Sequence, residues 1–115
     1  MWNIEDSDLD DAQHVVVRHM YDSDHAAVIW FGFVGGQLLK DHETTSVAII
    51  QVLKGIIRLT TGETRDLEAG STVELQPSER HALQAMSPKA LVQLLLVPHP
   101  RYHSLAESLD LPSRS

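Results

Sequence analysis

Cysteine is absent from this chain, and its absence removes several kinds of chemistry at once. Disulfides, iron–sulfur clusters, thiolate zinc sites and a cysteine nucleophile are all excluded. Basic residues are also few, with nine Lys and Arg against sixteen Asp and Glu and a formal net charge of −7. This charge repels phosphate backbones and anionic lipid surfaces, so we expect neither nucleic acid nor a membrane as a partner.

Long apolar runs are missing as well. Stretches such as Leu94 to Val97 fall far below the roughly 20 residues that are needed to cross a bilayer. Acidic residues crowd positions 5–11, where an export signal would be basic and then apolar. Together with the lack of cysteine, these features predict a cytoplasmic protein.

The 115 residues that are present have the size and balance of one globular domain, with 43% hydrophobic and 22% charged residues. We divide the chain into an acidic lead-in (1–13), a β-rich domain (14–98) and a C-terminal tail (99–115). In the tail, Ser104 and Glu107 match a capping box. This pattern predicts a short C-terminal helix.

Short β-prone runs, separated by glycine and proline turn signals, fill the β-rich domain. The predicted strands are residues 14–20, 26–34, 47–53, 56–61, 64–67, 72–75, 81–86 and 90–97. Many short strands at regular spacing favour an all-β sandwich or barrel. In the second run, alternation places Trp30 opposite Phe31 and Phe33, so one side should line the barrel and the other should pack on a partner or on the N-terminal segment.

Two groups of residues resemble the motifs of the single-domain cupins. Gly36, His42 and Gly55 match the opening glycine, the first metal histidine and the closing glycine of the first cupin motif. Gly70 and His81 match the opening glycine and the metal histidine of the second motif. The resemblance covers roughly residues 14–97 and implies a single antiparallel cupin-type β-barrel, a jelly roll, into which both histidines point.

The chain departs from the cupin pattern at the metal site. Thr44 and Ala48 stand where a complete site carries a second histidine and a glutamate, and Ser78 replaces a glycine of the second motif. The resemblance still allows a divalent metal (Zn, Ni, Fe, Mn or Cu) on the incomplete set His42 and His81, with modest affinity because protein sites usually supply three or more ligands.

We therefore expect the barrel to bind a small polar molecule near the two histidines. The predicted pocket residues are His42, Thr44, Ala48, His81 and Gln93. Gln93 is included because a buried amide needs hydrogen-bond partners, whereas Gln51 has the opposite strand parity to Ala48.

Two other functions stay open. The resemblance also fits a metal-dependent cupin enzyme of the dioxygenase, isomerase or decarboxylase type, although no catalytic residue can be assigned, and it fits a regulatory or structural partner protein. The resemblance further implies a homodimer formed by strand exchange or sheet packing. The remaining histidines are expected at the surface or at strand edges: His14, His19, His25, His99 and His103.

Overall fold

The computed structural model describes residues 9–42 and 44–98, and this part of the chain forms nine β-strands. The strands are β1 Val16–Asp22, β2 Ala27–Val34, β3 Leu38–His42, β4 Val47–Lys54, β5 Ile56–Thr60, β6 Thr64–Glu68, β7 Thr72–Leu75, β8 His81–Ala85 and β9 Lys89–Val97. All but β3 coincide with predicted runs. The predicted C-terminal helix and residues 1–8 of the acidic lead-in lie outside the described residues.

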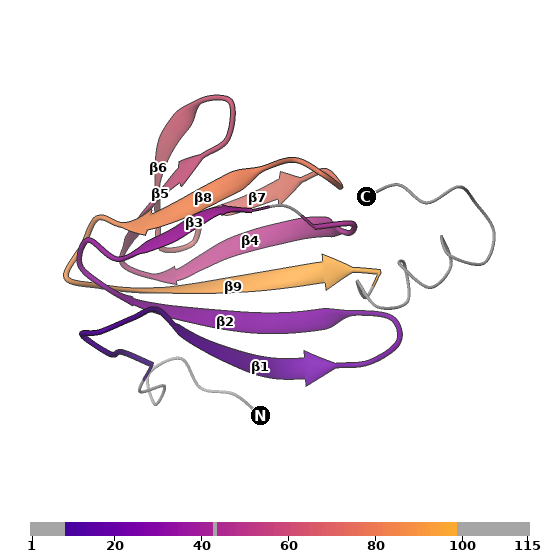
Figure 1. The fold of residues 1–115 in the computed structure, drawn as a ribbon, viewed down its shortest axis with the longest axis horizontal. Helices are drawn as coiled ribbons and strands as arrows, with labels where there is room; N and C mark the ends of the chain where they lie inside the picture. The colour runs from indigo at the N-terminus through magenta and orange to yellow at the C-terminus, as the bar shows by residue number, and fades with distance from the viewer. Residues whose placement is uncertain (1–8, 43, 99–115) are drawn as a thin grey trace.

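The strands build two antiparallel sheets that lie against each other. The five-stranded sheet has the order β1-β2-β9-β4-β7, and the four-stranded sheet has the order β3-β8-β5-β6. Figure 1 shows β1 along one edge of the molecule and the β5–β6 hairpin at the other. This arrangement confirms the predicted all-β jelly roll. The described residues include no helix long and apolar enough to cross a membrane.

Apolar side chains from both sheets fill the space between them. Phe33 and Ile50 of the five-stranded sheet and Ile57 and Leu83 of the four-stranded sheet are almost completely buried. Buried and partly exposed residues alternate along β4, as expected for a strand with one face on the core. The predicted parity of β2 is confirmed, because Phe31 and Phe33 belong to this core.

The outer face of the five-stranded sheet carries a second, smaller apolar cluster. Trp30 packs there with Leu9 and Leu91, so the N-terminal segment covers the side of β2 that faces away from the core. A Cβ added at Gly32 would overlap the carbonyl oxygen of Leu9. The missing side chain of Gly32 therefore lets the N-terminal segment lie directly on β2.

Candidate ligand-binding site

His81 begins β8 and faces the interior of the barrel. Its side chain is 1% exposed, and it shares its face of the strand with Leu83 and Ala85, which are buried core residues. Among the side chains that the structure describes, it is the only buried group that can titrate. Buried polar side chains in proteins usually have hydrogen-bond partners. The buried imidazole of His81 therefore makes this end of the barrel interior a candidate site.

The hydrogen bond of His81 defines its tautomer. Its Nδ1 atom lies 3.1 Å from the backbone oxygen of Glu79. A carbonyl oxygen can only accept, so Nδ1 carries the proton and donates it. In the neutral ring, Nε2 therefore keeps its lone pair, and this atom is also buried. The ring is prepared to accept a hydrogen bond or to ligate a cation through Nε2.

The backbone register brings His42 to His81. The two residues are direct partners in the β3–β8 ladder. The pairing depends on an irregularity between Leu39 and His42, where β3 contains one extra residue. The bulge therefore sets the backbone pairing of the two histidines, because without the extra residue Asp41 would be opposite His81.

Thr44 lies beyond the end of β3, in the loop that leads to β4. Its hydroxyl accepts a hydrogen bond from the backbone nitrogen of Ser46 at 2.8 Å and lies 3.0 Å from the oxygen of the same residue. Its backbone oxygen accepts a 2.7 Å hydrogen bond from the nitrogen of Ser78, which has a positive φ of 68° where the cupin motif has glycine. Thr44 thus joins the two loops beside His42 and His81.

Ala48 points into the core from β4, with 1% of its surface exposed. It pairs with Leu75 on β7, and short loops connect β7 to His81 and β3 to β4. Ala48 therefore lies at the same end of the barrel as the histidine pair. The cupin resemblance implies a glutamate ligand at this position, and here the methyl group of Ala48 belongs to the core instead.

Gln93 does not face the interior, and its assignment to the pocket is wrong. It is the direct partner of Gln51 in the β4–β9 ladder, so both amides lie on the outer face of the sheet. Its Oε1 atom accepts a 2.8 Å hydrogen bond from Nε1 of Trp30. The amide that the sequence indicated is thus satisfied by the outer cluster and not by a ligand.

The donor set falls short of a complete metal site. No group of three His, Cys, Asp or Glu side chains that could hold a metal ion occurs among the described residues. The tautomer of His81 suits a metal ligand, but Thr44 and Ala48 supply no further donor that points inward. The described residues therefore fit a hydrogen-bonded ligand better than a tightly held metal.

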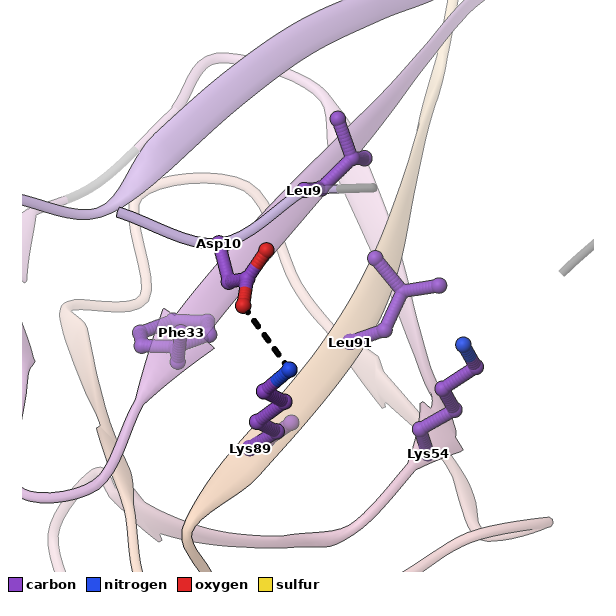
Figure 2. Close-up of a pocket in the computed structure, with 7 residues that line it drawn as sticks. Leu9, Asp10, Phe33, Lys54, Lys89 and Leu91 are labelled. Atoms are coloured by element: carbon purple, nitrogen blue, oxygen red, sulfur yellow. Dashed lines mark ion pairs between the residues drawn. The ribbon is translucent and has the colours of Figure 1, made fainter. Parts of the chain in front are cut away.

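A hollow that the sequence did not indicate lies at the other end of β4 and β9. It has a volume of about 90 Å³, and Lys54 and Lys89 are among the residues that line it (Figure 2). Lys54 directly precedes Gly55, the closing glycine of the first cupin motif, but no pattern in the sequence pairs it with Lys89. Their approach depends on strand register that the sequence does not show.

Of the other histidines, His14, His19 and His25 are exposed as predicted, whereas His99 and His103 lie outside the described residues.

No protein-family model matches the chain, and no curated protein matches its sequence. Solved structures do match. KdgF from a Halomonas species has a TM-score of 0.73 at 20% identity, over 84% of this chain and 93% of that one. An RmlC-like cupin family protein with a double-stranded β-helix fold from Methanocaldococcus jannaschii has a TM-score of 0.72 at 21% identity, over 79% and 86% of the two chains.

An RmlC-like cupin protein from Desulfovibrio desulfuricans has a TM-score of 0.72 at 19% identity, over 82% of this chain and 92% of that one. At these identities the likeness concerns the fold, and it agrees with the sheet order and with the positions of the motif glycines, since Gly36, Gly55 and Gly70 all have positive φ. The chain is a small domain with the cupin double-stranded β-helix fold.

Proposed function

We propose that this cupin domain binds a small polar molecule at the interior end of the barrel, with His42 and His81 as its main polar contacts. The observation that supports the proposal is the inward-facing His81, whose Nδ1 is occupied by the carbonyl of Glu79 and whose backbone partner is His42. Barrel ends with apolar walls and a few convergent polar groups are common ligand sites.

The ligand would be a hydrogen-bond donor at the position that faces Nε2 of His81. A neutral imidazole with Nδ1 protonated offers only an acceptor at that atom, so hydroxyl, amide or protonated acid groups suit it. The buried residues at this end of the barrel are aliphatic, among them Ala48, Leu75 and Leu83. This combination favours a hydroxylated or amide-bearing small molecule over a fully apolar one.

We place the protein in the cytoplasm, because the sequence has no cysteine.

A ligand-observed NMR screen of small polyols, hydroxy acids, keto acids and amides tests this proposal. Compounds that bind the wild type should lose at least about tenfold in affinity in His81→Ala, a difference of about 1.4 kcal/mol. His25→Ala is the matched control, because His25 is exposed in the turn between β1 and β2. The proposal fails if every compound found binds His81→Ala and His42→Ala as tightly as the wild type.

Elemental analysis of protein prepared without a histidine tag measures whether the wild type and the histidine variants contain metal. The proposal expects a ligand that binds in the absence of stoichiometric metal. Stoichiometric metal that disappears in the His42→Ala/His81→Ala double variant would instead favour a metal-dependent cupin with a third ligand.

A further inference from the structure

A second pocket lies at the end of the barrel opposite to the histidine pair. It forms where β4 ends, where β9 begins and where the N-terminal segment crosses the sheet (Figure 2). Its volume of about 90 Å³ is well above the roughly 10–15 Å³ that a single water molecule requires. The residues that line it are Leu9, Asp10, Phe33, Lys54, Lys89, Ala90 and Leu91.

Strand register brings the two lysines of the pocket together. Lys54 is the direct partner of Leu91, and Lys89 is two residues before Leu91 on β9. The lysines are therefore diagonal neighbours, a relation that places Cα atoms about 7–8 Å apart and within reach of long side chains. A register shift between Val52 and Lys54 produces this pairing, as bulges commonly redirect a side chain.

Gly55 keeps the turn after Lys54 close to β9. Its φ is +75°, and a Cβ at this position would collide with the carbonyl oxygen of Lys89. Only glycine combines this backbone conformation with so close an approach. The turn thus holds the end of β4 beside the start of β9, so that both lysine stems start from a fixed backbone.

The charges of the pocket do not cancel. Nζ of Lys89 forms a 2.9 Å ion pair with the carboxylate of Asp10. Lys54 makes no ion pair or side-chain hydrogen bond within residues 9–42 and 44–98. Among the described residues that line the pocket, two ammonium groups and one carboxylate leave one positive charge, in a chain whose net charge is −7. A ligand with a single negative charge would neutralise this excess.

The remaining walls are apolar and in place before a ligand arrives. Phe33 and Leu91 are buried, and Leu9 is held against the outer cluster. The N-terminal wall is fixed further by a 2.7 Å hydrogen bond from Nε2 of Gln37 to the backbone oxygen of Asp11. Figure 2 shows Leu9, Phe33 and Leu91 around the Asp10–Lys89 pair. A preformed pocket that combines apolar walls with a few charged groups is typical of a small-molecule site.

We propose that this pocket binds a small monocarboxylate, with its carboxylate between Lys54 and Lys89 and its apolar part against Phe33 and Leu91. A doubly charged phosphate suits the pocket less well, because Asp10 already supplies a negative charge and the apolar walls would remove water from the second charge. The site is separate from the histidine pair, so each can be tested without the other.

Backbone-amide NMR spectra recorded with butyrate and with butyramide test the proposal. The two probes have nearly the same shape, but only butyrate is charged. Butyrate should cause saturable shifts at the amides of Lys54, Ala90 and Leu91 with a millimolar Kd, and butyramide should bind at least about tenfold more weakly, a difference of about 1.4 kcal/mol. Equal binding of the two probes, or no saturable shift at these amides, overturns the proposal.

Three variants assign the effect to the pocket. Lys54→Met, or Lys54→Gln if the first is unstable, should weaken butyrate binding at least about tenfold, because it removes the positive charge that has no carboxylate partner among the described residues. Asp10→Asn should strengthen binding, since it removes the competing carboxylate. Lys40→Met, on β3, is the matched control and should bind as the wild type does. Equal losses in Lys40→Met and Lys54→Met, or weaker binding in Asp10→Asn, would contradict the proposal.

Discussion

His81 is positioned before any ligand arrives. Its strand places the ring among core residues, and the carbonyl of Glu79 fixes the ring orientation through Nδ1. A side chain held in this way loses little conformational freedom on binding. Thr44 and Ala48, the positions at which the cupin resemblance implies two further metal ligands, contribute to the loop and to the core respectively.

A carboxylate introduced at position 48 tests whether this position lies close to the histidine pair. Ala48→Glu places a carboxylate at a buried position near the histidine pair, so the metal-free variant should lose more than about 2 kcal/mol of stability. Because His42, His81 and the new carboxylate would form a three-ligand set, zinc should raise the Tm of Ala48→Glu by several degrees. Thermal unfolding with and without zinc measures both effects.

Gln51→Glu, on the outer face of the same strand, is the control for this experiment. It should change stability little, and zinc should not affect its Tm more than that of the wild type. If zinc stabilises both variants equally, or neither, Ala48 and the two histidines do not converge in the way described.

The histidine pair could be predicted from the cupin motifs, but the rest of the site could not. Without the bulge in β3, Asp41 and not His42 would be opposite His81, and nothing in the local sequence indicates that bulge. Gln93 was misassigned because parity within β9 cannot be related to parity within β4 without the register that pairs Gln93 with Gln51. Long-range register is set by the whole sheet, so local sequence does not contain it.

The strands themselves could be predicted where β-branched residues and turn signals are dense. β3 was missed because its sequence, Leu38 to His42, has no β-branched or aromatic residue. It becomes a strand through its ladder with β8, in which Leu39 pairs with the buried Leu83. Tertiary pairing therefore overrides weak local propensity at the edge where the candidate site lies.

The packing of the N-terminal segment on β2 should require glycine at position 32. In Gly32→Ala, the new methyl group overlaps the backbone of Leu9, so the variant should lose about 1–3 kcal/mol of stability. Gly62→Ala is the matched control, because nothing lies within 4 Å of a Cβ there. Apart from the difference in backbone preference between glycine and alanine, it should change the free energy of unfolding by no more than about 0.5 kcal/mol. Urea unfolding measures both. Equal stability of the two variants would contradict the close contact between Leu9 and β2.

The β5–β6 hairpin carries an exposed cross-strand pair, Arg58 and Asp66. The guanidinium donates hydrogen bonds of 2.8 and 3.2 Å to the two carboxylate oxygens. These hydrogen bonds from Arg58, aided by its charge, lower the pKa of Asp66 below its ordinary value. The folded state therefore binds this proton less readily than the unfolded state, so the pair stabilises the fold at a pH above the ordinary aspartate pKa of about 3.9.

The contribution of this pair should disappear in acid. Asp66→Asn should be slightly less stable than the wild type near neutral pH, and the difference should shrink to nothing as the pH falls through the lowered pKa of Asp66. High salt should reduce it as well, because the pair is exposed. In an Arg58→Met background the substitution should have no such effect. A stability difference that persists unchanged in acid would contradict the role of the ion pair.

We propose that the whole molecule is a homodimer that uses β1. This strand forms the edge of the five-stranded sheet, and its side chains Val17 and Tyr21 are each 50% exposed. An exposed edge with large apolar residues is open to pairing with a second copy. Light scattering at micromolar concentration should give about twice the 12.8 kDa of one chain.

Substitutions should locate the interface. Val17→Lys/Tyr21→Glu should give a monomer, because charges would be buried between the copies. Leu38→Lys changes an equally exposed residue on β3, in the other sheet, and should leave the dimer intact. A wild-type monomer at micromolar concentration, or a dimer that survives the double substitution, would rule out this interface.

The most direct test of the account concerns a single atom, Nε2 of His81. Long-range proton–nitrogen NMR correlations of the histidine rings, recorded with and without the compounds that bind the wild type, report its protonation and its contacts. We predict that His81 has its proton on Nδ1 in the free protein, and that the Nε2 resonance moves on ligand addition while those of His25 do not. A His81 ring protonated on Nε2, or an Nε2 resonance that stays unchanged while the ligand binds, would contradict the proposed site.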